Sequence, residues 1–508
     1  MPEILFHDSP ERMLVDNSKI SYQKFGRRLA SGVPGGDLRL RRESQLDVIW
    51  RRPHRPTWSN SFSYLGIIIL SPLLVIFSWI TLSHYQGSLL DSTIAMYADG
   101  PWQFVARHGP TPSLHVVGVY TAWVLIHSVL YNYIPTRLNT GQLTPAGYLL
   151  QYHTNGLSAW VLTHIALASG VFFRVIDPAW IAKNWSGLLV AINIYGFLLS
   201  AFVYIKAYIA PTHAKDRKFS GSIVYDFYMG IELNPRLGEF WDFKLFHNGR
   251  PGIVAWTLID LSFAAWQYEK IGYLTNSMVI ITILHAVYVV DFFVNEDWYL
   301  RTIDICHDHF GFYLGWGSVV WLPAMYTIQA QYLVYNPVSL SPFAAAGILA
   351  TGLGGYFIFR SVNHEKDIVR RTNGKCLIWG KPAGVLKCTY RTADGNQHQS
   401  LLLYTGWWGV SRHANYLGDL ILSYSMCATC GANNLLPWFY AIYMTVLLLH
   451  RCKRAEQRCA VKYGQDWDSG TLDGLDGVTM PAMTHSLAEP CWDWESTGFL
   501  GTVMLMNN

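Results

Sequence analysis

The chain has 508 residues, of which 51% are hydrophobic, 15% aromatic and only 14% charged. Soluble domains carry about 25% charged residues, so much of the surface of this protein is expected to face lipid. The net charge is only +4, and no basic run is interleaved with aromatic residues, so the composition excludes a nucleic-acid partner.

The first 57 residues form a polar segment that we expect to be cytosolic. Its basic side chains precede the first apolar run and include Arg39, Arg41, Arg42, Arg51, Arg52 and Arg55. The positive-inside rule places such a segment in the cytosol. The first apolar run starts only near Phe62, too far along the chain for a secretory signal.

Ten apolar runs follow, and a helix that crosses a membrane needs about 20 mostly apolar residues. The runs are Phe62–Leu82, Leu114–Ile134, Leu157–Ile176, Trp185–Ile209, Ile253–Trp266, Asn276–Val294, Phe310–Tyr335, Phe343–Phe359, Leu417–Cys430 and Leu435–Leu449. Several are short or carry Asp, His or Asn, which indicates helices with a polar face inside a bundle. The predicted fold is an all-α, polytopic transmembrane helical bundle of about ten spans. It would occupy residues 58–468, between the N-terminal segment 1–57 and an atypical tail at 469–508.

A polar block at Gly221–Thr257 interrupts the apolar runs. Its ionisable and amide side chains are Asp226, Glu232, Asn234, Arg236, Asp242, Lys244 and Arg250. A polar group left unpaired at a membrane is costly, so these side chains must pair with one another, with water or with a ligand.

Two basic stripes are expected at the cytosolic mouth of the C-terminal half. Lys366 and Arg370 share one helical face, and a second stripe, Arg451, Arg454, Arg458 and Lys462, follows spacings of three, four and four. The segment 406–419 between them offers paired Trp rings and the Asn415–Tyr416 amide and phenol. This pattern suits a phosphorylated dinucleotide, although charge that only fixes membrane orientation is an alternative. No dinucleotide fingerprint is present.

The segment 288–310 is dense in ionisable groups and carries a His-Asp-His run at 307–309. It has three interpretations: a metal site, a polar seam between helices, and an acid that donates a proton. No His-rich box of the kind that di-iron membrane enzymes use is present, so we predict no metal. The Cys427 and Cys430 pair is interpreted as two small packing residues.

Three long motifs carry a family resemblance. They are Gly221-x-x-Val-Tyr-Asp-x-Tyr-x-Gly-x-x-Leu-Asn-Pro-Arg236 and the runs Trp241–Trp256 and Thr302–Gly311. On these residues the chain resembles the sterol-reductase family, which includes the Δ14 and Δ24(28) enzymes, and the two runs are similar to its Δ7 branch. The resemblance covers roughly Leu143 to Asp466.

The resemblance implies a multi-pass enzyme of the endoplasmic-reticulum membrane that uses NADPH to reduce the C7–C8 double bond of a Δ7 sterol. The sterol, the bilayer and other enzymes of sterol biosynthesis are its expected partners. Family cofactor positions carry over onto Lys366, Arg370, Leu403, Trp408, Asn415, Tyr416, Cys459, Ala460, Val461, Lys462 and Tyr463. Tyr288 matches a position proposed for the proton donor, and Asp291, Asp308 and Glu232 are its rivals.

The chain departs from the family in places that bear on activity. A family Asp at the cofactor site is Ala455, a usual Asp is Ser318, and the tail after Asp468 is unrelated. Glu456 is a candidate substitute for the missing carboxylate. Three alternatives stay open: another sterol double-bond reductase, a membrane methyltransferase that uses S-adenosylmethionine and shares the Arg412–Gly418 pattern, and a sterol-binding protein without catalysis.

Overall fold

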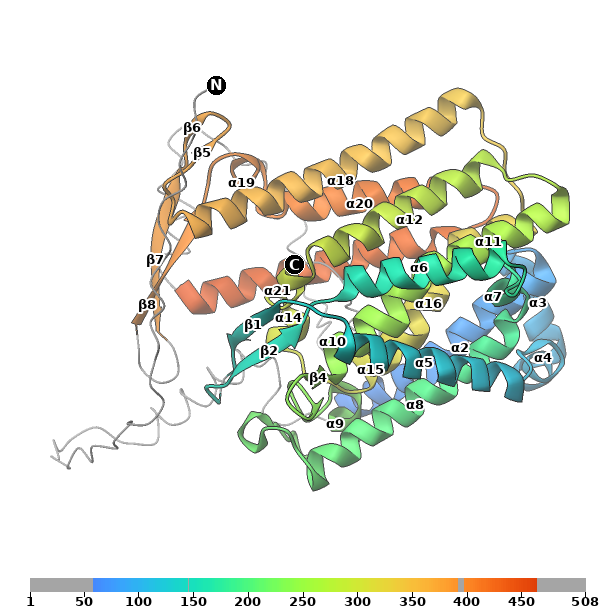
Figure 1. Ribbon diagram of the computed structural model, residues 1–508, viewed down its shortest axis with the longest axis horizontal. Helices are drawn as coiled ribbons and strands as arrows, with labels where there is room; N and C mark the ends of the chain where they lie inside the picture. Colours follow the sequence, from blue (N-terminus) through green and yellow to red (C-terminus); the bar gives the residue numbers. More distant parts are fainter. Residues whose placement is uncertain (1–57, 145, 392–396, 464–508) are drawn as a thin grey trace, which may run out of the picture. The chain divides into compact units, whose positions relative to one another are not determined.

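The structure is a computed structural model that describes residues 58–144, 146–391 and 397–463. The predicted segments 1–57 and 469–508 lie outside the described residues. Within the described part the protein is mostly helical, as predicted (Figure 1). Five helices are long and apolar enough to cross a membrane: Ser61–Tyr85, Leu114–Tyr133, Trp185–Ile209, Asn276–Val294 and Pro342–Arg371.

The first half of the described chain contains helices and two small sheets. The helices are α2 (Trp58–Tyr85), α3 (Leu89–Asp99), α4 (Pro101–His108), α5 (Leu114–Tyr133), α6 (Gly156–Phe172), α7 (Trp180–Lys183), α8 (Trp185–Ile209), η1 (Ala214–Asp216), α9 (Ile223–Met229), α10 (Phe243–His247) and the π-helix η2 (Asn248–Val254). The strands are β1 (Leu138–Leu143), β2 (Leu149–His153), β3 (Arg236–Leu237) and β4 (Trp241–Asp242).

The second half also contains helices and two small sheets. Its helices are α11 (Ala255–Ile271), α12 (Asn276–Val294), α13 (Glu296–Tyr299), α14 (Ile303–Cys306), α15 (Phe312–Trp316), the π-helix η3 (Gly317–Trp321), α16 (Leu322–Met325), α17 (Ile328–Tyr335), α18 (Pro342–Arg371), α19 (Trp407–Val410), α20 (Ala414–Ala428), η4 (Leu436–Trp438) and α21 (Phe439–Tyr463). Its strands are β5 (Leu377–Ile378), β6 (Lys381–Pro382), β7 (Val385–Arg391) and β8 (Gln397–Leu403).

Helix starts follow local capping chemistry. The side chain of Ser113 accepts a hydrogen bond from the backbone of α5, Thr275 does so for α12, and Ser341 does so for α18. Each cap satisfies an N–H group that has no partner inside the helix. Pro342 stands at the first position of α18, where its missing N–H costs nothing. These signals fix where the long helices begin.

The predicted all-α class misses four antiparallel two-stranded sheets. All four lie in segments that connect helices. The hairpin β7–β8 falls inside the polar segment after α18, where Val385 pairs with Leu403 and Arg391 with Gln397. A period of two over seven residues is a weak signal beside the apolar runs, which explains why the hairpin was missed.

The predicted span Phe310–Tyr335 is not one helix. It is divided among α15, η3, α16 and α17. Pro323 has no N–H to donate, and the π-helix η3 directly precedes it. The two π-helices also approach each other closely, because a methyl group on Gly252 in η2 would lie 2.7 Å from the backbone oxygen of Ser318 in η3. Inserted turns of this kind are frequent at functional sites.

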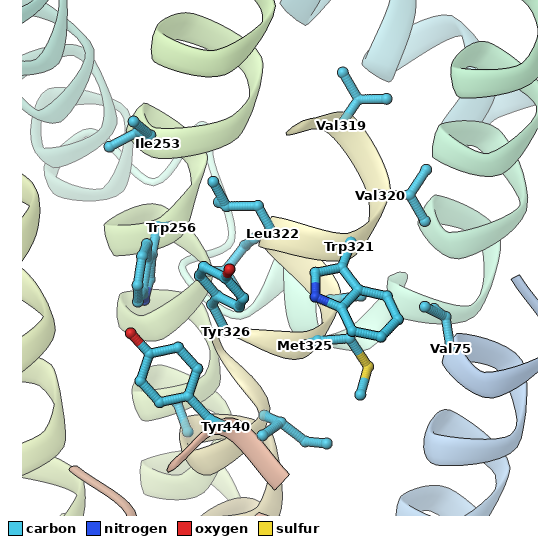
Figure 2. Packing of buried hydrophobic residues seen from close by; sticks show 14 of the residues in the cluster. Val75, Ile253, Trp256, Val319, Val320, Trp321, Leu322, Met325, Tyr326 and Tyr440 are labelled. Carbon is cyan, nitrogen blue, oxygen red and sulfur yellow. The ribbon is translucent and has the colours of Figure 1, made fainter. Parts of the chain in front are cut away.

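Aromatic rings fill the centre of the main core (Figure 2). The ring centroids of Trp256 on α11 and Tyr326, directly after α16, are 5.5 Å apart, and those of Tyr326 and Tyr440 on α21 are 5.0 Å apart. These separations fall in the range in which aromatic pairs add stability beyond their buried area. The core therefore joins α11, α16 and α21 around one group of rings.

The polar block is held mainly by buried ion pairs. Lys206 of α8 donates to both oxygens of Glu232, at 3.0 and 3.2 Å. The backbone N–H of Thr212 donates to the same carboxylate at 2.7 Å. Arg236 and Asp242 pair within the block at 3.2 Å. The prediction that these groups must find partners is confirmed for both pairs, and the partners are protein side chains.

Arg250 makes the most central of these pairs. Its guanidinium is fully buried, 2.7 Å from Glu296 of α13 and 2.8 Å from the side-chain oxygen of Asn155. Glu296 also accepts from the backbone N–H of Gly156 at 2.7 Å, and Asn155 donates to the backbone oxygen of Tyr131 at 2.9 Å. One ion pair thus connects η2, α13, the end of α5 and the start of α6.

Lys244 pairs in a different way. Its ammonium group donates to the backbone oxygens of Ile305 and Asp308, at 3.1 and 2.6 Å. Burial lowers the pKa of Lys244 to about 8. The block is therefore tied to the Thr302–Gly311 run through backbone carbonyl groups, which the sequence pattern alone does not reveal.

Glycines bring α18 and α20 into backbone contact, and α18 runs alongside α12 and α20 (Figure 1). A methyl group on Gly418 would lie 2.6 Å from the backbone nitrogen of Phe359 and 2.7 Å from the backbone oxygen of Gly355. Small residues permit such an approach between membrane helices. Gly355 therefore serves helix packing, whereas a methyl group on Gly354 would meet open space.

We expect Gly418→Val to lower the stability of the protein by more than about 3 kcal/mol, because a side chain at this position overlaps the backbone of α18. Thermal unfolding in detergent micelles measures the effect. The matched control is Gly354→Val on α18, which should change the midpoint little. Equal midpoints for the two variants would refute the contact between α18 and α20.

Candidate active site

Tyr288, the predicted proton donor, lies on the inner face of α12. Its side chain is 9% exposed, and its ring centroid lies 5.4 Å from that of Trp256. Its hydroxyl makes no hydrogen bond to another described residue. A phenol held in apolar surroundings keeps its proton until a substrate accepts it, so the position suits a general acid.

Tyr288 opens into a small pocket between α12, α13 and α18. The pocket has a volume of about 60 Å³ and combines aromatic rings with polar groups. Its lining residues are Tyr288, Asp291, Phe292, Asn295, Trp298, Tyr299, Thr302, Phe359, Arg360 and Asn363. This volume is well below the roughly 300–1,000 Å³ of ligand sites, so the pocket is at most one part of a larger site.

Asp291 also lines the pocket, but its carboxylate already accepts hydrogen bonds from other side chains. Arg360 of α18 donates to both of its carboxylate oxygens, and the Tyr356 hydroxyl donates to it at 2.7 Å. Two charge-assisted hydrogen bonds fix the position of this carboxylate. The geometry therefore fits a residue that positions α18 against α12 better than it fits a proton donor.

Glu232 and Asp308 do not line this pocket. Glu232 is buried in its ion pair with Lys206, and Asp308 is 5% exposed with its backbone oxygen bound by Lys244. The structure thus brings Tyr288 and Asp291 together and leaves the other two predicted acids outside the pocket.

The predicted cofactor residues gather where α18 meets α19 and α20. The Lys366 ammonium lies 5.1 Å from the centroid of the Trp408 ring, and the indole N–H of Trp408 donates to the backbone oxygen of Val362 at 3.1 Å. Asn415 donates to the side-chain oxygen of Asn363 at 3.4 Å. Since Asn363 also lines the pocket of Tyr288, it connects the two groups.

The other predicted cofactor residues are placed less closely together. Tyr416 stacks on His413 with centroids 5.1 Å apart, Leu403 is half-buried in β8, and Arg370 is exposed on α18. The backbone of Cys459, Ala460, Val461, Lys462 and Tyr463 belongs to α21. The structure does not describe the side chains of these five residues.

Two anchoring residues were missed by the sequence analysis. Glu365 accepts a hydrogen bond from the backbone N–H of Trp407 at 3.0 Å, and Ser361 accepts one from the Trp407 indole at 2.9 Å. Ser361 and Glu365 are four residues apart and share a helical face. That spacing could have indicated a polar face that binds a neighbouring segment. The prediction instead considered only the cations Lys366 and Arg370, which lie on the adjacent face.

One expectation about the second basic stripe is wrong. Arg451 is 5% exposed, and its guanidinium lies 3.6 Å from the carboxylate of Asp304. Helical spacing places Arg451 on the face of α21 that carries the buried Tyr443 and Leu447. It therefore belongs to the interior of the bundle and does not extend a stripe of solvent-facing cations.

The residues that converge here suit a phosphorylated dinucleotide. Lys366 supplies a cation, Trp408 a ring, and Asn415 an amide. Cys427 and Cys430 are instead buried in helix packing, where Gln329 donates to the Cys427 sulfur at 3.3 Å. No group of three or more His, Cys, Asp or Glu side chains gathers among the residues that the structure describes.

Comparison with known proteins decides the family. A family model described as the ergosterol biosynthesis ERG4/ERG24 family matches residues 60–471. The chain belongs to the ERG4/ERG24 family of sterol reductases. A curated relative from Danio rerio, named 7-dehydrocholesterol reductase, is 47% identical over 462 residues, which cover 88% of this chain and 96% of the relative.

Two further ERG4/ERG24 relatives carry the same name and a different one, respectively. The 7-dehydrocholesterol reductase of Xenopus laevis is also 47% identical, over 87% of this chain and 96% of that protein. The Delta(14)-sterol reductase of Methylotuvimicrobium alcaliphilum is 37% identical, over 81% of this chain and 93% of that protein. With its five apolar helices, the chain is thus a multi-pass membrane sterol reductase.

Proposed function

We propose that this chain reduces the C7–C8 double bond of a Δ7 sterol similar to 7-dehydrocholesterol, with NADPH as the reductant. The observation that carries the proposal is the 47% identity to relatives named 7-dehydrocholesterol reductase. The meeting of Tyr288 with the segment of Lys366, Trp408 and Asn415 through Asn363 supports it.

The chemistry follows from the substrate. A ring alkene is not polarised toward hydride attack, so a proton must add first and create a carbocation. Tyr288 would hold that proton within about 3 Å of the alkene. Trp256 and Phe292 keep water away from the cation. Lys366, Trp408 and Asn415 would hold NADPH, which supplies the hydride when bound.

We further propose a location and a topology. The apolar helices α6, α11, α20 and α21 and the broken segment α15–α17 would complete about ten spans. The protein would lie in the endoplasmic-reticulum membrane, with the cofactor segment at the cytosolic side. Other enzymes of sterol biosynthesis are its proposed partners.

Conversion of 7-dehydrocholesterol by membranes that contain the chain tests this function. NADPH should support loss of the Δ7 double bond, NADH should support much less, and a Δ14 sterol should react slowly. Preferential reduction of the Δ14 sterol would favour the other named activity among the relatives. Protection from proteolysis by S-adenosylmethionine, and not by NADPH, would favour a methyltransferase. Absence of conversion with retained sterol binding would favour a non-catalytic protein.

We expect Ala455→Asp to raise NADPH-dependent turnover by about tenfold, since a charged hydrogen bond contributes about 1.5–3 kcal/mol. Ala455 lies four residues after the buried Arg451, so a carboxylate there shares its helical face. Steady-state kinetics against NADPH measure the gain. In the parent chain Glu456→Gln serves as the comparison: it should lower activity if Glu456 substitutes for the missing carboxylate. An unchanged rate for Ala455→Asp would show that the chain works without this group.

A further inference from the structure

The pocket beside Tyr288 has the size of a water site. A buried water needs a cavity of roughly 10–15 Å³ and a few polar partners, so the pocket volume of about 60 Å³ has room for several waters. The fused rings of a sterol are far larger than this space. The substrate would therefore approach Tyr288 from outside the pocket, and the pocket itself suits a smaller ligand.

Three polar groups in the pocket wall are available to such a ligand. Asn295 uses its side-chain N–H to donate to the backbone oxygen of Asp291, and Asn363 uses its side-chain oxygen to accept from Asn415. The remaining Asn295 oxygen, the Asn363 nitrogen and the Tyr288 hydroxyl make no hydrogen bond to any residue that the structure describes. All three atoms still touch open space, unlike the Tyr299 hydroxyl, which is fully enclosed. Two donors and one acceptor can thus hold water beside Tyr288.

The proposed reaction takes one proton from Tyr288 in each turnover. The O–H bond of Tyr288 breaks as a C–H bond forms on the sterol, and the resulting carbocation is quenched by hydride. A phenolate remains, and it must gain a proton before the next sterol can react. Within the described part of the chain no side chain donates a hydrogen bond to this phenol, so water is the proton donor that the geometry provides.

The pocket lies where water can enter the bundle. Helix α12 ends at Val294, and Asn295, Trp298 and Thr302 in the pocket wall follow that end. Arg360 of α18 forms another part of the wall, and its side chain is 23% exposed. The pocket thus extends from the buried ring of Tyr288 to a partly exposed side chain beside the end of a helix.

We propose that this pocket is a water-filled inlet through which Tyr288 regains its proton after each turnover, an inference that rests on the proposed function. A water held by Asn295 and Asn363 gives a proton to the phenolate, and the hydroxide left behind takes a proton from the surrounding solution. Each turnover therefore consumes one proton from solution, one hydride from NADPH and one double bond of the sterol.

Asn295→Leu tests the proposal, because it places a larger, apolar side chain in the pocket wall and leaves Tyr288 intact. The first turnover uses the proton that Tyr288 already carries, so its rate should stay close to that of the parent. Later turnovers need water in the pocket and should slow by about 10² or more, the usual contribution of an efficient proton transfer. Rapid mixing with excess 7-dehydrocholesterol and NADPH resolves both phases through the loss of NADPH absorbance.

Two further variants control for the lost amide. Asn295→Ala removes the same amide but leaves room for water, so its later turnovers should be faster than those of Asn295→Leu. Asn132→Leu also removes a hydrogen bond from an asparagine side chain to the backbone oxygen four residues earlier, but it lies outside the pocket and should match the parent in both phases. Asn295→Met replaces Asn295→Leu if the latter does not fold, because its flexible side chain adapts to the available space.

The outcomes separate this inference from the function on which it rests. Equal slowing of the first and later turnovers in Asn295→Leu would indicate a structural role and overturn the inlet. Parent-like later turnovers in that variant would overturn it as well. A rise in KM for NADPH with no change between the two phases would assign the pocket to the cofactor, and this too would overturn the inference. Failure of the parent chain to complete even a first turnover would instead refute the proposed function.

Discussion

Tyr288→Phe is expected to lower the rate of sterol reduction by about 10²–10⁴, the usual contribution of a positioned general acid. The substitution keeps the ring that packs on Trp256 and removes only the hydroxyl. Because that hydroxyl makes no hydrogen bond to a described residue, the fold should be unaffected. The affinity for NADPH should also be unaffected, since the proposed cofactor residues Lys366, Trp408 and Asn415 lie on α18, α19 and α20 and not on α12.

Single-turnover kinetics with saturating NADPH measure this loss directly, because they separate the chemical step from product release. A fluorescence titration with NADPH reports binding on the same sample. The matched control is Tyr120→Phe, which removes a buried hydroxyl without a partner among the described residues and should retain the parent rate. Parent-like turnover in Tyr288→Phe would remove this phenol from the mechanism. Asp291 would not be the next candidate, because Arg360 and Tyr356 occupy its carboxylate.

The second large effect concerns stability. Arg250→Met is expected to destabilise the protein by about 3–5 kcal/mol, because it leaves the buried carboxylate of Glu296 without its charged partner. The double variant Arg250→Met with Glu296→Met should recover much of this loss, since neither charge then remains buried. Recovery will be incomplete, because Asn155 and Gly156 also lose their hydrogen bonds.

Thermal unfolding in micelles measures both variants, and Arg107→Met is a suitable comparison. Arg107 pairs with Asp99 at 2.8 Å, but its side chain is 61% exposed. Exposed pairs contribute less than about 1 kcal/mol, so this variant should keep the parent midpoint. A small effect of Arg250→Met would show that the junction of η2, α13, α5 and α6 does not depend on this pair.

The positions of the long helices could be predicted from the sequence. The runs Trp185–Ile209 and Asn276–Val294 coincide with α8 and α12, because length and apolar content alone set those bounds. The run Phe310–Tyr335 is interrupted at Tyr326 and Thr327, a few residues after Pro323, and the apolar pattern does not reveal this interruption. An apolar run does not reveal where its helix changes from α- to π-helical geometry. The contact between Gly252 and Ser318 could not be predicted either, because it joins residues far apart in the chain.

The candidate site contains residues that the sequence suggests and contacts that the sequence cannot suggest. Tyr288 and Asn415 are predicted from family positions, and in the structure Tyr288 shares a pocket with Asn363, to which Asn415 donates a hydrogen bond. The partner of Asp291 was not found, because Arg360 lies 69 positions away and no local spacing joins them.

The length of helix α18 determines how the thickness of the membrane can affect this protein. Its 30 residues form a rod of about 45 Å, of which the apolar run Phe343–Phe359, about 25 Å long, can lie in the hydrocarbon layer of about 30 Å, and the polar remainder extends beyond it. Arg360, in the pocket wall, and Lys366, beside Trp408, are carried on the same rod. A bilayer of different thickness changes the tilt of such a helix, so lipid composition would shift both halves of the site together and tune the enzyme as one unit.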